Sequence, residues 1–90
     1  MSGDQAEGHS MEQVIRDYIN QEIVSGQELP LIKDDTQLVE SGILDSLSIL
    51  RLVLFIEEKY ALKIAPGDVI PENFGTVEMI CRYLRKKKNL

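Results

Sequence analysis

Residues 42–60 read GILDSLSILRLVLFIEEKY, and this stretch decides the fold. From Ser46 to Tyr60 no glycine or proline interrupts the chain, and apolar residues recur three and four positions apart, as on one face of an α-helix. Asp45 precedes the stretch, where a short polar side chain can cap a helix. The sequence therefore predicts a helix over 46–60 with Asp45 as its N-cap.

The middle of this helix is unusually apolar. Residues 52–56 are five consecutive apolar residues, and at 100° per residue they point almost all round a helix. Either the helix is buried on most sides, or its outward apolar residues meet a partner. In so small a domain we favour a binding surface.

Upstream, residues 11–24 are predicted to form the first helix. Ser10 and Gln13 have the spacing of a capping box, and apolar residues then recur at helical spacing until Ser25-Gly26. The connection to the next helix is about twenty residues long, which is uncommon for a structureless loop. Its apolar residues, including Leu38, predict that it packs across the helices.

Downstream, Pro71 is suited to the first position of a short helix, and Thr76 to the cap of a last one. Val77, Ile80, Cys81 and Leu84 would form the apolar stripe of that last helix. With no convincing strand, the sequence predicts an all-α bundle of three long helices and one short helix. We expect residues 1–9 to be a disordered tail and 10–88 to be the domain.

Composition narrows the function. The chain has 90 residues, enough for one domain, and 6% aromatic residues with no tryptophan, which predicts an aliphatic core. Residues 1–81 hold all fifteen acidic residues but only five of the ten basic ones. Such a field repels nucleic acid and anionic membrane and attracts basic protein surfaces. We therefore expect protein partners and no nucleic acid.

The cysteine and histidine contents argue against catalysis or metal binding by this chain. Cys81 is the single cysteine and His9, in the expected tail, the single histidine, so neither a Ser–His pair nor a metal cluster can be assembled. No apolar run approaches the roughly 20 residues that span a bilayer. With no secretory signal visible, we expect an intracellular, cytoplasmic protein that is not an enzyme and does not insert into membranes.

The chemistry-bearing feature is Ser46 at the first turn of the predicted helix. Asp-Ser before a helix is most often only a cap, but a helix N-terminus, with its unpaired N–H groups, also favours an attached phosphate. Asp45-Ser46-Leu47, followed by an apolar helix that ends in Glu57, Glu58 and Tyr60, resembles the phosphopantetheine attachment motif of acyl carrier proteins. The similarity covers nearly all of residues 11–85, including the order of the helices.

The resemblance implies an acyl-carrier-protein-like bundle, a monomer, with a long loop between its first two long helices. In that family a separate phosphopantetheinyl transferase uses coenzyme A to place 4'-phosphopantetheine on the serine, here Ser46. The thiol of the arm then carries acyl or aminoacyl groups as thioesters, and ligases and acyl-processing enzymes perform the chemistry. Asp45 would cap the helix and help to orient the transferase, and Leu47 would flank the attachment point.

The resemblance also implies a docking face, which would comprise Leu47, Leu50, Arg51 and Leu54. Carriers for bulk fatty-acid synthesis commonly have acidic residues where this chain has Ser48 and Arg51, so we expect specialised partners in a lipid or secondary-metabolite pathway. Residues 42–45 and 71–76 look more like discrete carriers loaded by adenylating ligases, including aminoacyl, D-alanyl and peptidyl carriers. The cargo stays open between an amino acid and a specialised fatty or polyketide acyl chain.

A hypothesis of another class needs no modification of Ser46. The helix over 46–60 would then be an unmodified docking module that binds a partner through Leu47, Leu50, Leu54 and Phe55. The two hypotheses differ in whether coenzyme A and a transferase change the mass of the chain.

Overall fold

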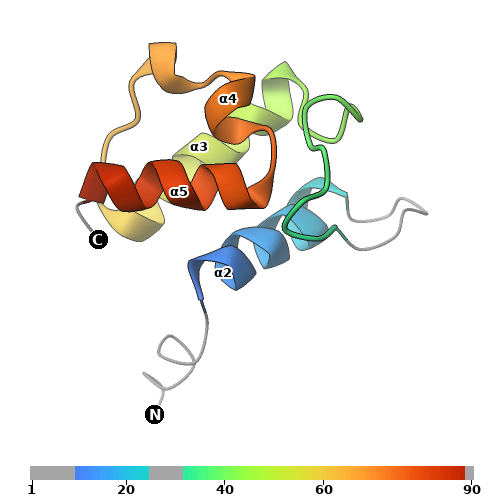
Figure 1. Ribbon diagram of the computed structural model, residues 1–90, viewed down its shortest axis with the longest axis horizontal. Coiled ribbons are helices and arrows are strands. Elements are labelled where there is room, and N and C mark those ends of the chain that lie inside the picture. Colours follow the sequence, from blue (N-terminus) through green and yellow to red (C-terminus); the bar gives the residue numbers. More distant parts are fainter. Residues whose placement is uncertain (1–9, 25–31, 89–90) are drawn as a thin grey trace.

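The computed structural model describes residues 10–24 and 32–88 and shows helices joined by turns, with no strand in those residues. The elements are α2 (Met11–Tyr18), a π-helical turn η1 (Ile19–Ile23), α3 (Ser46–Tyr60), a 3-10 turn η2 (Pro66–Asp68), α4 (Pro71–Phe74) and α5 (Val77–Lys88). The helix α5 packs against both α2 and α4, and α3 lies behind it in Figure 1. The predicted all-α bundle is confirmed. The expected tail, residues 1–9, lies outside the described residues.

The first helix begins as predicted and ends differently. Ser10 Oγ accepts a hydrogen bond from the Gln13 N–H at 3.1 Å, which caps α2. The regular helix stops at Tyr18, and the chain continues as the π-turn η1, in which the Val24 N–H donates to the Ile19 carbonyl at 2.9 Å. A bond between residues five apart brings Ile19 and Val24 to one face, and both are buried. The predicted end at Ser25-Gly26 lies outside the described residues.

The other helices follow their local signals. The helix α3 has the predicted bounds, with Asp45 as N-cap, and α4 begins at Pro71. Thr76 Oγ1 accepts a hydrogen bond from the Met79 N–H at 3.1 Å at the start of α5. The predicted stripe of α5 is buried with other aliphatic side chains, and the largest buried side chain is Phe74. The 3-10 turn η2 was not predicted.

The second half of the long connection packs over the junction of α4 and α5, as expected. The Leu38 N–H donates to the Gly75 carbonyl at 2.8 Å, and the Glu78 N–H donates to the Asp34 carbonyl at 3.1 Å. Gly42, at φ +86°, makes the turn that leads the chain into α3. The buried side chains of this segment are Ile32, Leu38 and Leu44. The segment is therefore held on the helices by both backbone bonds and apolar contacts.

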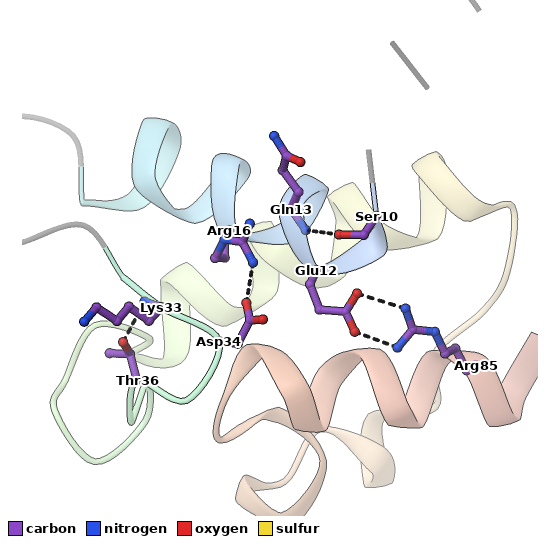
Figure 2. A network of polar contacts seen from close by, with 8 residues as sticks. All are labelled: Ser10, Glu12, Gln13, Arg16, Lys33, Asp34, Thr36 and Arg85. Carbon is purple, nitrogen blue, oxygen red and sulfur yellow. Dashed lines mark hydrogen bonds and ion pairs between the residues drawn. The ribbon is translucent and has the colours of Figure 1, made fainter. Parts of the chain in front are cut away.

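Two ion pairs join α2 to the rest of the bundle (Figure 2). Arg85 of α5 donates to both carboxylate oxygens of Glu12 at 2.6 and 2.9 Å, and Arg16 pairs with Asp34 of the long connection. The bond from Arg85 lowers the pKa of the Glu12 carboxyl. The partners are 73 and 18 residues apart in sequence, and the sequence analysis did not predict either pair.

Candidate functional site

The candidate site lies where the long connection enters α3. Ser46 is the first residue of this helix and is exposed. Asp45 before it is extended, and its Oδ1 accepts hydrogen bonds from the Leu47 and Ser48 N–H groups at 3.2 and 2.8 Å. The expectation of unpaired N–H groups beside Ser46 is therefore wrong for these two, because Asp45 already uses them. An anion attached to Ser46 is left with the positive end of the helix dipole rather than these two amides.

The cap contributes an electrostatic stabilisation that depends on pH. The bond from the Ser48 N–H holds the pKa of the Asp45 carboxyl below its ordinary value of 3.8. A group whose pKa is lower in the folded state stabilises the fold when ionised. That stabilisation is complete above pH 3.8 and is lost as the pH falls through the folded-state pKa.

Substitution of this cap gives a prediction. Asp45→Ala should lower the urea midpoint of unfolding at pH 7, because two N–H groups of α3 lose their acceptor. The gap between the variant and the native chain should narrow as the pH falls below 3.8. Urea titrations of both proteins between pH 7 and pH 3, followed by circular dichroism, measure this gap. A gap that stays constant over that range would show that the charge of Asp45 does not contribute.

An apolar cavity adjoins Ser46, which we call the Ser46 pocket. It has a volume of about 200 Å³ and lies between the long connection, α3 and the segment before α4. Besides Asp45 and Ser46 it is lined by Val39, Leu44, Ile49, Val69, Ile70 and Pro71. The sequence analysis missed these residues, because only the folded chain brings 69–71 beside 45–49.

Polar contacts hold the segment before α4 that forms one wall of the Ser46 pocket. Tyr83 of α5 donates to Asp68 Oδ2 at 2.7 Å, and Asn73 donates through Nδ2 to the Asp68 carbonyl at 2.9 Å. Burial, together with the bond to Asp68, raises the pKa of Tyr83 to about 12. The phenol therefore stays protonated at neutral pH and keeps η2 attached to α5. Val69 and Ile70, which follow η2, are positioned by these bonds.

The predicted docking residues share one exposed face of α3. Leu47, Leu50 and Leu54 are 70%, 57% and 65% exposed, and Arg51 is exposed among them. Within the apolar run, Leu52, Val53 and Ile56 turn into the core. The question that the run raised is thus answered by the structure: the helix is buried on one side only and presents leucines to solvent.

Phe55 does not belong to this face, although the docking-module hypothesis included it. Its side chain is only partly exposed, and its ring stacks on Tyr18 with centroids 4.1 Å apart. The stacking joins α2 to α3 and makes Phe55 part of the edge of the core.

Arg51 has a partner within the chain. Its Nη2 lies 3.7 Å from Glu22 Oε1, and the side chains are 51% and 54% exposed. An exposed pair of this kind is worth about 0–1 kcal/mol, so it can be exchanged for another partner at little cost. Arg51 is also the single charged residue between Ser46 and Ile56. It is therefore the one charged residue of α3 among the exposed leucines Leu47, Leu50 and Leu54.

A larger hollow lies at the other end of α3. It has a volume of about 660 Å³, and its lining includes Leu54, Glu58 and Lys63. The fifteen residues of α3 rise about 20 Å, so this hollow is remote from Ser46. Its position argues against a part in chemistry at the serine.

Other reactive groups are few in the described part of the chain. Cys81 is fully buried, and burial raises the pKa of its thiol to about 12, as expected for a small apolar core residue. No three histidine, cysteine or carboxylate side chains gather into a metal site in residues 10–24 and 32–88. Over the same residues, no helix combines the length and apolar content needed to cross a membrane.

Comparisons with known proteins agree with this picture. A family model described as a phosphopantetheine attachment site matches residues 14–84. A solved structure described as the crystal structure of an FAD-dependent dehydrogenase contains a chain that is 31% identical, with a TM-score of 0.71. That match covers 78% of this chain and 97% of that chain. The comparison with curated proteins gave no significant match.

Proposed function

Because this chain belongs to the phosphopantetheine-attachment family of acyl carrier proteins, whose members carry a covalently attached 4'-phosphopantetheine group, we propose that Ser46 is its attachment point. The observation that supports this most is the exposure of Ser46 at the first turn of α3, inside the matched region. The group fits the site in two respects. The hydroxyl is accessible, and the Ser46 pocket offers an apolar surface beside it.

The attachment step needs no catalytic group on this chain. The Ser46 oxygen forms a bond to the phosphorus of coenzyme A that bears the pantetheine. The bond from that phosphorus to the bridging pyrophosphate oxygen breaks, 3',5'-ADP leaves, and the hydroxyl proton passes to the transferase. When bound, the arm supplies a thiol that holds an acyl or aminoacyl group as a thioester. What this chain contributes is an accessible hydroxyl on a rigid helix end.

The arm makes the carrier useful to several enzymes in turn. A tethered substrate reaches the active site of each docked partner at high effective concentration. The exposed leucines of α3 are the proposed contact, with Leu47 beside Ser46 and Leu50 and Leu54 further along the helix. The chemistry of the pathway would take place in the partners: the transferase, an activating ligase and downstream acyl-processing enzymes.

One of these partners is suggested by the comparisons. The chain in the structure described as an FAD-dependent dehydrogenase is matched over 97% of its length, so it is no longer than this 90-residue chain. We propose that a flavin-dependent dehydrogenase acting on the tethered thioester is among the partners of this carrier as well. The loading enzyme would be an adenylating ligase, as residues 42–45 and 71–76 suggest.

The test of the proposed function is a mass measurement on the full chain. Incubation with coenzyme A and a broad-specificity phosphopantetheinyl transferase should add the mass of one phosphopantetheinyl group. Peptide mapping should place it on the peptide that contains Ser46. An unchanged mass under conditions that modify a known carrier would remove the carrier proposal and favour the unmodified docking module, which the exposed leucines of α3 also support.

The charge of the docking face gives a further prediction. Arg51→Glu should raise the rate at which an acyl–carrier ligase that uses acidic fatty-acid carriers loads the modified protein, by about tenfold. The reason is that Arg51 repels a basic carrier site, whereas glutamate attracts it. Steady-state loading of the two proteins measures the effect, and Arg51→Gln should give an intermediate rate.

Salt provides the control for this effect. The gain should shrink at 1 M salt, where the Debye length is about 3 Å. Equal loading rates for the native chain and Arg51→Glu at low salt would mean that Arg51 does not select partners. The ion pair of Arg51 with Glu22 would then be a surface contact without a part in the choice of partner.

A further inference from the structure

A charged hollow lies between α5 and the start of α2. It has a volume of about 360 Å³ and is lined by Glu12, Glu78, Arg82, Arg85 and Lys86. We call it the basic hollow, because three of its five lining side chains are cations. Its sign is opposite to that of residues 1–81, which hold all fifteen acidic residues and only five of the ten basic ones.

One cation of the basic hollow is already held by the fold. Arg85 donates to both carboxylate oxygens of Glu12 at 2.6 and 2.9 Å, so its charge is committed to that pair (Figure 2). Arg82 and Lys86 are exposed, and no ion pair between residues that the structure describes involves either of them. They are four residues apart on α5, so their side chains are neighbours on one face of the helix. These two cations can therefore receive an anionic group from outside the chain.

The dipole of α5 does not account for Arg82. The effect of a helix dipole on charged side chains is confined to the end turns, and the last turn of α5 holds Arg85 and the three lysines. Arg82 is the sixth of the twelve residues of α5. It therefore adds a positive charge to the basic hollow without acting on the end of the helix.

The basic hollow and the exposed leucines of α3 lie on different sides of the first helix. Glu12, near the start of α2, reaches Arg85 of α5. Tyr18, at the end of α2, stacks on Phe55 of α3. A protein that binds the leucines of α3 therefore leaves the basic hollow accessible.

The basic hollow is also remote from Ser46. Lys88, in the last turn of α5, donates through Nζ to the Tyr60 carbonyl at 2.9 Å, so this end of α5 lies at the C-terminal end of α3. Ser46 is at the opposite end of α3, about 20 Å away along the helix axis. A group bound in the hollow would not cover the serine.

The surrounding charges limit what can bind. Glu12 and Glu78 line the hollow beside the cations, and the whole chain has a formal net charge of -5. A long polyanion or a flat anionic membrane would bring further negative charge against both carboxylates and the rest of the domain. A short acidic protein segment can instead place single carboxylates on Arg82 and Lys86, and a guanidinium binds a carboxylate through two parallel hydrogen bonds.

We propose that the basic hollow binds an acidic segment of a partner protein through Arg82 and Lys86. This partner is opposite in charge to the basic surfaces that the rest of the chain attracts. The interaction does not depend on modification of Ser46, so it goes beyond the proposed function. It lets the chain stay bound to one protein while the leucines of α3 contact another.

The probe is a capped hexaglutamate peptide, titrated into the unmodified full chain at about 0.01 M salt, where the Debye length is about 30 Å. NMR signals of the backbone amides and of the Arg82 side chain report binding. Signals of residues 82–86 should shift and saturate, whereas those of Leu47 and Leu54 should stay in place. Absence of saturable shifts at residues 82–86 would overturn the proposal and leave attachment at Ser46 untouched.

Two neighbouring lysines, both exposed, provide a matched control. Lys86→Gln should weaken peptide binding about three- to fivefold, because it removes a cation that lines the hollow. Lys87→Gln removes the same charge about 100° further round the helix, outside the lining, and should change the affinity less than about twofold. Glu78→Gln should tighten binding, because it removes a repelling carboxylate. Equal losses for the two lysine variants would mean that general positive charge, not the hollow, attracts the peptide, and the proposal would fail.

Two further titrations distinguish other sources of negative charge. Inorganic phosphate should shift the signals of residues 82–86 less than the peptide does at an equal concentration of charge. Phosphatidylserine vesicles should bind the chain no more tightly than uncharged phosphatidylcholine vesicles. Phosphate shifts as large as those of the peptide would indicate a simple anion site, and vesicle binding that Lys86→Gln abolishes would assign the surface to a membrane. Either result would overturn the proposal.

Discussion

Ser46→Ala should lose all acceptance of phosphopantetheine from coenzyme A, the largest functional effect that we expect of any single substitution. Removing the hydroxyl removes the oxygen that bonds to phosphorus, and no neighbouring group can replace it at the same place. The measurement is intact mass after incubation with a broad-specificity transferase, with the native chain alongside. The expected result is a complete mass shift for the native chain and none for the variant.

Ser48→Ala is the matched control, because Ser48 lies in the same first turn of α3 and its N–H donates to the same Asp45 oxygen. This variant should be modified as fully as the native chain. The free energy of unfolding of Ser46→Ala, measured in urea, should also equal that of the native chain to within about 0.5 kcal/mol, because Ser46 is exposed. A mass gain on Ser46→Ala would mean that another residue is the attachment point.

Phe74→Ala should have the largest effect on stability, a loss of about 3–5 kcal/mol. Phe74 has no exposed surface, and its ring lies 5.8 Å from that of Tyr83. Its helix α4 has four residues, too few for a stable helix without tertiary contacts. Native domains have a total stability of about 5–15 kcal/mol, so the variant should lose a large fraction of its stability. Urea unfolding followed by circular dichroism measures the loss.

Two comparisons test the reason for this effect. Phe74→Leu keeps much of the apolar volume and should cost clearly less than the alanine variant. Phe55→Ala removes a ring that is only partly buried and stacked on Tyr18, so it too should cost less. A loss below about 1 kcal/mol for Phe74→Ala would mean that the core closes over the missing ring.

The helices could be predicted because their signals are local. Asp45 and Thr76 each accept a hydrogen bond from a backbone N–H three residues further on. Pro71 lacks a backbone N–H, but in the first turn of a helix this group would have no partner within the helix. These residues therefore mark the starts of α3, α4 and α5 without reference to the rest of the chain. The outward leucines of α3 follow from the same local reasoning, since five consecutive apolar residues cannot all face one core.

The end of the first helix and the turn η2 could not be predicted in this way. In η1, Ile19 and Val24 are both buried, and a hydrogen bond joins these two residues, which are five apart in the chain. Their burial depends on contacts with the rest of the bundle. The expectation of free N–H groups beside Ser46 failed for another reason: the predicted cap itself, Asp45, accepts hydrogen bonds from the Leu47 and Ser48 N–H groups.

By itself, then, the sequence determined where α3, α4 and α5 begin, which face of α3 is apolar and that Ser46 heads it, because capping and helical periodicity act over three or four residues. The tertiary structure alone decided the pairing of Arg85 with Glu12, the exchangeable pair of Arg51 with Glu22 and the cavity beside Ser46. Each of these joins residues far apart in the chain, and contacts of that kind form only when packing brings the helices together.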